Sequence, residues 1–181
     1  MRHYEPFSPS GLSFRERIGE PDEVSAALGL IAINFQELEE TLAAAIARRL
    51  GAEARKARTV SAELSFSRRL NLLAALARDE RSVMGTPDSY SSKDDELGQL
   101  IALCAQAEDL RNQYIHSVWP ARHYEGTRAV RIKRTAKRRG FREVNQEVTA
   151  GQLLDVAEYI AYVCTMVEQF FDLSFGVADG E

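Results

Sequence analysis

Apolar residues recur every three or four positions over a long stretch near the N-terminus, and this spacing constrains the fold more strongly than any other feature of the chain. The stripe is made of Val24, Leu28, Ile31, Phe35, Leu38, Leu42 and Ala45. Such a period places the apolar side chains on one face of an α-helix, which needs partners to bury that face. Pro21 suits the first position of the helix and Gly51 suits its stop. We therefore predict a helix from Pro21 to Leu50.

Three further segments show the same helical period. Their apolar stripes are Phe66, Leu70, Leu73 and Ala77; Leu100, Leu103, Ala107, Leu110 and Tyr114; and Leu153, Ala157, Ile160, Cys164, Val167 and Phe171. The first stripe predicts a helix over 61–79. The second predicts a helix that Ser92 caps and that ends before Pro120. Thr149 and Gln152 have the spacing of a capping box, which begins a last helix that ends near Leu173.

The period changes between the third and the last predicted helix. From Thr127 to Thr135 apolar and basic residues alternate, which is typical of a β-strand. Arg139 to Phe141 suits a turn, and Phe141 to Val148 suits a returning strand. The predicted fold class is mainly α: a four- to five-helix up-and-down bundle with a basic β-hairpin, over 118–148, inserted before the last long helix.

Length and composition agree with one soluble domain, since 45% of the 181 residues are hydrophobic and 28% are charged. We predict an irregular arm over 1–20, a single helical domain over 21–175 and a tail over 176–181. Cys104 and Cys164 are too few for a disulfide scaffold. No apolar run suits a signal peptide or a membrane span, so we expect a cytoplasmic protein that does not contact a membrane.

Charge is distributed unevenly along the chain. The net charge is −4, yet residues 122–142 hold nine Lys or Arg and one acidic residue. A local positive block on an otherwise acidic protein suits a surface that faces a polyanion. The alternative is a solvated, flexible loop, and charge alone leaves both interpretations open.

A polar cluster follows the apolar stripe of the third predicted helix. Asp109, Asn112 and His116 are three and four residues apart, so they share one helical face, and the long side chain of Arg111 reaches the same space. His exchanges a proton near neutral pH, and Arg holds a phosphate in a fork of donors. Together they suit phosphodiester cleavage without a metal ion. The alternative is that Arg111 pairs with Glu108 and His116 merely ends the helix.

The segment Arg111-Asn112-Gln113-Tyr114-Ile115-His116 resembles the R-x4-6-H motif of the HEPN superfamily, including the Asn directly after Arg. The position of the motif at the end of the third helix is similar to that in the family. Ser117 and Trp119 also resemble family members, as does the run from Phe35 to Glu39. The resemblance covers about residues 22–173 and is specific in the motif.

The resemblance implies a helical bundle that dimerises and brings two such motifs together at a cleft. It implies a metal-independent endoribonuclease, of the kind found in defence and toxin–antitoxin systems, that leaves 2′,3′-cyclic phosphate and 5′-hydroxyl ends. Arg111 and His116 would be the catalytic pair, with Asn112, Glu108 and Asp109 in support. RNA, a second copy of the chain and an antitoxin or regulatory protein would be its partners, and no cofactor is implied.

Two features depart from the family pattern. Val118 stands where toxins paired with a nucleotidyltransferase antitoxin often carry Tyr, and the basic hairpin is longer than the family needs. We predict that the hairpin holds RNA through its backbone phosphates, with Tyr124 or Phe141 available for stacking. The phosphate-binding residues of this prediction are Arg131, Lys133, Arg134, Lys137, Arg138 and Arg139.

Two other functions stay open from the sequence. The polar motif can serve as a ligand pocket in a non-catalytic, dimeric HEPN-like module that binds nucleic acid, a nucleotide or a partner protein. The chain can also be a purely structural bundle with a disordered basic loop. No metal site is expected, because Pro120 interrupts any helix between His116 and His123 and no third ligand lies at a metal-binding spacing.

Overall fold

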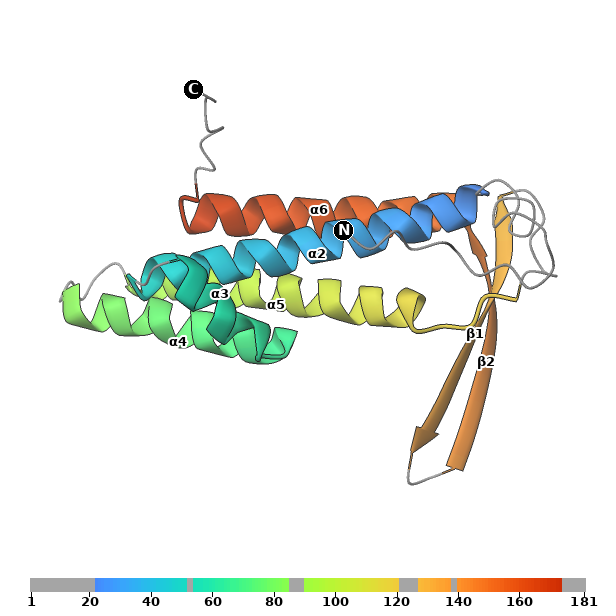
Figure 1. The fold of residues 1–181 in the computed structure, drawn as a ribbon, viewed down its shortest axis with the longest axis horizontal. Helices are drawn as coiled ribbons and strands as arrows, with labels where there is room; N and C mark the ends of the chain where they lie inside the picture. The colour runs from blue at the N-terminus through green and yellow to red at the C-terminus, as the bar shows by residue number, and fades with distance from the viewer. Residues whose placement is uncertain (1–21, 52–53, 85–89, 121–126, 138–139, 174–181) are drawn as a thin grey trace, which may run out of the picture.

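The computed structural model describes residues 22–51, 54–84, 90–120, 127–137 and 140–173. Its elements follow the order α2 (Glu23–Arg49), α3 (Ala54–Ala62), α4 (Phe66–Met84), α5 (Tyr90–Ile115), β1 (Arg128–Lys137), β2 (Gly140–Thr149) and α6 (Ala150–Phe170) (Figure 1). The predicted fold class, a helical bundle with a hairpin inserted before the last long helix, is confirmed. The predicted arm, the tail, His123 and Tyr124 lie outside the described residues.

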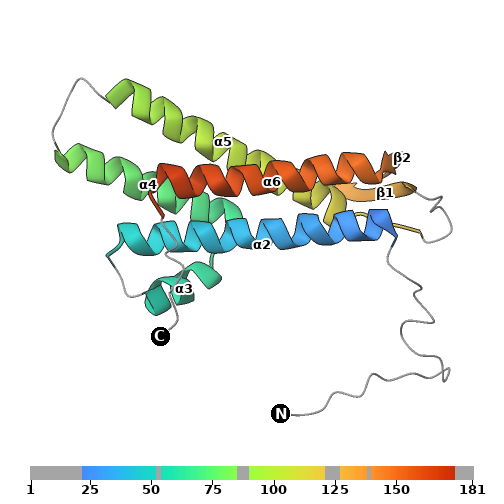
Figure 2. The ribbon, with the colours of Figure 1, turned by 90° about the horizontal axis from the view of Figure 1, so that it is seen from above.

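The centre of the bundle is the pair formed by α2 and α6, which run side by side in the same direction (Figure 2). The Asn34 amide donates to the carbonyl of Ala157 at 2.8 Å, and the Thr41 hydroxyl lies 3.2 Å from the Cys164 sulfur. Both pairs are separated by 123 residues, as two parallel helices in register require. The predicted apolar stripes face inward, because Ile31, Leu38, Leu42, Leu153 and Ile160 are fully buried.

The second layer of the bundle is made by α4 and α5. The rings of Phe35 and Phe66 lie 4.8 Å apart, and Arg69 pairs with Glu39 at 3.4 Å, so α4 also runs parallel to α2. Between α2 and α4, the short helix α3 carries the chain back. After α4, α5 runs in the direction opposite to α2 and α4 (Figures 1 and 2). The direction therefore alternates from each helix to the next, but because α3 is short, three of the four long helices, α2, α4 and α6, run the same way.

Two helix boundaries differ from the prediction. The single helix predicted over 61–79 is broken at 63–65 into α3 and α4. The break is stabilised by Arg69, whose Nε donates to the carbonyl of Ser61 at 2.8 Å. Ser92 is not a cap, because α5 begins earlier, at Tyr90. The predicted capping box at Thr149 and Gln152 is confirmed, with both reciprocal hydrogen bonds present.

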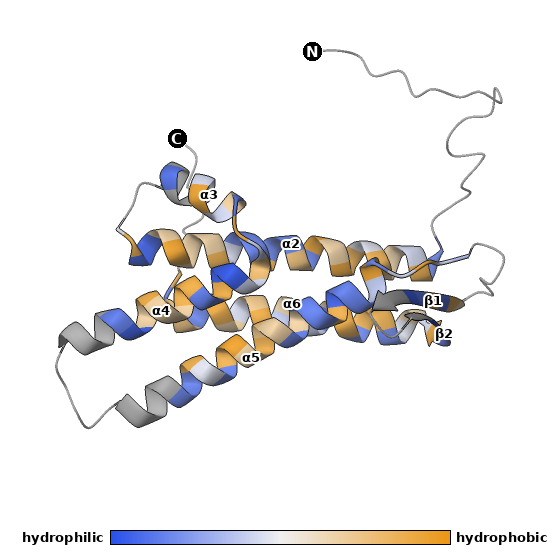
Figure 3. Ribbon diagram, turned by 90° about the horizontal axis from the view of Figure 1, so that it is seen from below, coloured by the Kyte–Doolittle hydropathy of each residue, from blue (hydrophilic) through white to orange (hydrophobic). Residues whose placement is uncertain are grey.

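The hairpin is an antiparallel pair in which Ala129 faces Val148 and Lys133 faces Val144. Ala129 and Val148 are each 1% exposed, so the base of the hairpin belongs to the core of the bundle. The rest of the hairpin projects beyond the end of α5 (Figure 1). Along α5 the middle is hydrophobic, whereas the end nearest the hairpin is hydrophilic (Figure 3). None of the helices in the described part of the chain has both the length and the apolar character that crossing a membrane requires.

The two cysteines are buried in the core, and this burial makes a testable prediction. Burial raises the pKa of the Cys104 thiol to about 12 and also raises that of Cys164. Because only the thiolate attacks disulfide reagents, neither residue should react with Ellman's reagent at pH 8 in the native protein. After denaturation in urea, both thiols should react at once. Rapid reaction of the native protein would show that the core of the bundle opens readily.

Candidate functional site

The predicted polar cluster forms a connected site at the C-terminal end of α5. The Arg111 guanidinium donates from Nη1 to Nε2 of His116 at 2.9 Å and to Oδ1 of Asn112 at 2.9 Å. His116 is exposed, and Arg111 and Asn112 are half-buried. The three side chains that the motif predicted to act together are therefore in contact, at a position that solvent reaches.

The chain turns sharply after α5, and this turn places His116 beside Arg111. The hydroxyl of Ser117 donates to the carbonyl of Gln113 at 2.6 Å, and the indole of Trp119 donates to the carbonyl of Tyr114 at 3.0 Å. These side chains satisfy carbonyls that a helix end leaves without partners. Val118 then pairs with Ile132 of β1 through two backbone hydrogen bonds of 2.9 Å, which ties the site to the hairpin.

The contact with Arg111 defines which ring nitrogen of His116 faces the guanidinium. A guanidinium has only donors, so Nε2 of His116 must be the acceptor. Nε2 is also the nitrogen that faces the space beside Arg111, so it is the atom of His116 placed to accept a proton when Arg111 turns to another acceptor.

The Arg111 guanidinium rests on an aromatic platform. Its Cζ lies 5.1 Å from the centre of the Phe35 ring, which is 4% exposed and held in turn by Phe66. Both protons of Nη1 are used by Asn112 and His116. Nε and Nη2 have no hydrogen-bond partner among the described residues. They form the fork of donors that binds two oxygens of a phosphate.

Acidic residues lie beside the site, but none of those described forms an ion pair with Arg111. Burial raises the pKa of Glu108, repulsion from Asp109 and Glu39 adds to the increase, and Arg111 opposes it. Glu39 is paired with Arg69. No ion pair joins Arg111 to Glu108 within the described part of the chain, so the alternative in which these two residues simply pair is not observed. Glu108 and Asp109 lie near the site but do not bond to Arg111.

Arg131 has a different role from the predicted one. It is 4% exposed and donates to the carbonyl of Gln113 at 2.9 Å and to the side chain of Gln146 at 2.5 Å. Its Cζ also lies 5.2 Å from the centre of the Tyr114 ring. The prediction that Arg131 holds RNA phosphates is therefore wrong, because its guanidinium is buried between the hairpin and α5 and joins them.

The other basic side chains of the hairpin differ in whether an acidic neighbour already neutralises them. Arg134 forms an ion pair with Glu143 at 2.9 Å, which neutralises its charge. Lys133 is partly exposed and has no hydrogen-bond or ion-pair partner in the described segments. Arg138, Arg139 and the side chains of Lys137 and Phe141 lie outside the described residues.

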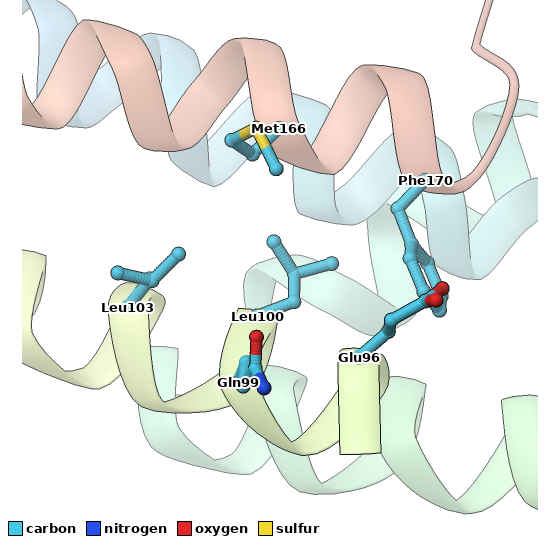
Figure 4. Close-up of a pocket in the computed structure, with 6 residues that line it drawn as sticks. All are labelled: Glu96, Gln99, Leu100, Leu103, Met166 and Phe170. Carbon is cyan, nitrogen blue, oxygen red and sulfur yellow. The ribbon is translucent and has the colours of Figure 1, made fainter. Parts of the chain in front are cut away.

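A separate pocket lies between α5 and α6, and its volume is about 200 Å³ (Figure 4). Its lining is mostly apolar and includes Leu100, Leu103, Met166 and Phe170, with Glu96 and Gln99 beside them. The pocket is far from the polar cluster. Leu103, its lining residue nearest to Arg111 in the sequence, is eight residues or about 12 Å along the helix from Arg111. The pocket contains no pair of groups suited to cleaving a phosphodiester. In the described ranges no three potential metal ligands come together.

Comparison of the chain with protein-family models, with curated protein sequences and with solved structures returned no match.

Proposed function

We propose that the chain is a metal-independent endoribonuclease of HEPN type, which cleaves RNA to 2′,3′-cyclic phosphate and 5′-hydroxyl ends. The observation that supports this proposal best is the 2.9 Å contact between Arg111 and His116 at the accessible end of α5. It places a permanent cation, whose Nε and Nη2 donors have no partner in the described part of the chain, beside an imidazole that can carry a proton.

The proposed reaction is an attack of the ribose 2′-oxygen on the adjacent phosphorus. The scissile phosphate binds to Nε and Nη2 of Arg111, and the guanidinium releases Nε2 of His116. That nitrogen takes the 2′-hydroxyl proton while the O2′–P bond forms and the P–O5′ bond breaks. The His116 imidazolium then gives this proton to O5′ of the leaving group, which restores the neutral ring.

Arg111 stabilises the extra negative charge that the phosphate carries in the transition state. Asn112 holds Nη1 and so keeps the guanidinium oriented when His116 leaves it. The chemistry needs one cation and one proton carrier, and both are present in the motif.

The proposal is tested by incubating the purified protein with total RNA in EDTA and identifying the ends of the fragments. Cleavage that persists in chelator and leaves cyclic phosphates is the expected result. If RNA depends on Arg111 for binding but stays intact, the chain is instead the non-catalytic module considered above. Intact RNA with no Arg111-dependent binding would reject both the ribonuclease and a module that binds RNA through this motif.

The aromatic platform gives a second prediction. Phe35→Leu keeps most of the buried volume but removes the ring beneath Arg111, so kcat for RNA cleavage should fall about fivefold, which corresponds to the loss of about 1 kcal/mol from a cation–π contact. Phe66→Leu is the matched control, because it removes the other ring of the same pair without touching Arg111. Its stability should fall similarly, but its kcat should stay within about twofold of wild type. Equal losses of kcat in both variants would show that Phe35 acts through stability alone.

The assembly and setting of the protein belong to the same proposal. A homodimer would bring two copies of the Arg111–His116 pair to one cleft. An antitoxin or another regulatory protein would keep a cytoplasmic ribonuclease of a defence or toxin–antitoxin system inactive until it is needed. Analytical ultracentrifugation of the purified chain measures its mass in solution and so tests whether it is a dimer.

A further inference from the structure

The two faces of the β-hairpin differ in charge. Side chains alternate between the faces of a strand, and residues directly opposite each other in an antiparallel pair share a face. The register therefore defines face one by Ala129, Arg131 and Lys133 of β1 with Arg142, Val144, Gln146 and Val148 of β2. Face two carries Arg128, Val130, Ile132 and Arg134 with Glu143, Asn145, Glu147 and Thr149.

The cations of face two are neutralised by their neighbours. Arg128 pairs with Glu147 at 3.2 Å, and Arg134 pairs with Glu143 at 2.9 Å. A polyanion that bound this face would have to break both ion pairs or approach two carboxylates.

Face one is anchored at its base and cationic further out. Ala129 and Val148 are buried, and Arg131 bonds to the end of α5. Beyond Arg131 come Lys133 and Arg142, neither of which has an ion-pair or hydrogen-bond partner among the residues that the structure describes. Val144, directly opposite Lys133 and two residues from Arg142, is 41% exposed.

This face begins next to the candidate site. His116 precedes Val118 by two residues, and Val118 pairs with Ile132, the neighbour of Lys133. Arg131 on the same face bonds to Gln113, which lies between Arg111 and His116 in the chain. A continuous strand of phosphates could therefore lie on Arg111 and on the cations of face one together.

We propose that face one, through Lys133, Arg142 and the apolar Val144 between them, binds the backbone of single-stranded RNA next to the scissile phosphate. The choice of RNA rests on the proposed function. Lys133 and Arg142 contact phosphates, and Val144 lies against a ribose or base. Arg142 is a new binding residue, whereas Arg134 is assigned to the neutralised face two.

The test compares two double variants that remove the same charge from opposite faces. K133Q/R142Q alters face one, and R128Q/R134Q alters face two. Both are made in the H116A background, so that RNA stays intact. Binding of a fluorescein-labelled 12-nucleotide single-stranded RNA is followed by anisotropy over a series of salt concentrations, and circular dichroism confirms the fold of each variant.

K133Q/R142Q should bind RNA about tenfold or more weakly at low salt, and the slope of log K against log salt should fall by about 1.4, the value for two lost phosphate contacts on a single strand. R128Q/R134Q should change affinity by less than about threefold. Equal losses in both variants, no loss in either, or no RNA binding at all would overturn the proposal. If the wild type cuts no RNA while only K133Q/R142Q weakens binding, the ribonuclease proposal fails and face one remains an RNA-binding surface.

Discussion

Replacing His116 by alanine is expected to lower the rate of RNA cleavage in EDTA by about 10²- to 10⁴-fold, the usual contribution of a positioned proton carrier. Arg111→Ala is expected to lower it by about 10²- to 10³-fold, because the charge on the phosphate in the transition state loses its fork of donors. The rates are measured under single-turnover conditions with an end-labelled RNA.

Three controls separate catalysis from folding. His116 is exposed, so H116A should leave the free energy of unfolding within about 0.5 kcal/mol of wild type. Arg111→Lys keeps the charge but not the fork, and should restore only a small part of the rate. Asp109→Asn changes an exposed neighbour that does not bond to Arg111, and should change the rate by less than about threefold. A wild-type rate in H116A would remove His116 from the mechanism.

The second large effect concerns stability. Arg131→Ala is expected to lower the free energy of unfolding by about 2–4 kcal/mol, because it leaves the acceptors of two hydrogen bonds without a donor and opens a gap between the hairpin and α5. The acceptors are the Gln113 carbonyl and the Gln146 side chain, and the packing on Tyr114 is lost with them. Urea denaturation followed by circular dichroism measures the change.

The matched control for this prediction is Arg128→Ala, three positions earlier on the same strand. Arg128 is exposed and forms only a surface ion pair with Glu147, so its loss should cost less than about 1 kcal/mol. If the two variants are equally stable, Arg131 does not anchor the hairpin to α5.

Much of the fold could be predicted because it depends on local patterns. Successive residues of the stripe on α2 are about one turn apart, as are the two residues of the capping box at Thr149. The alternation of apolar and basic residues likewise predicted the hairpin. The break between α3 and α4 could not be predicted, because it is stabilised by a bond from Arg69 back to Ser61 and by the packing of Phe66 on α2. The direction of α4 follows from the same non-local contacts.

In the candidate site, too, the contacts between residues close in sequence could be predicted and those between distant residues could not. Arg111, Asn112 and His116 lie within six consecutive residues, so their meeting follows from the local geometry of a helix end. The ring of Phe35 beneath Arg111 comes from another helix, α2. Because Phe35 belongs to an apolar stripe, the sequence predicted only a core residue there and no contact with the site. Alternation predicted that Arg131 and Lys133 share a face. Which of the two is buried depends on where α5 ends relative to the hairpin. The sequence of the strand alone does not contain that information.

The joint action of Arg111 and His116 is tested most directly by the rate of RNA cleavage in EDTA by the double variant R111A/H116A, measured beside both single variants. Two groups that act on the same phosphate in the same step lose their contributions together. The double variant should therefore cleave within about threefold of the slower single variant. A double variant slowed by the full product of the two single effects, or cleavage at the wild-type rate in all three, would contradict a shared catalytic site.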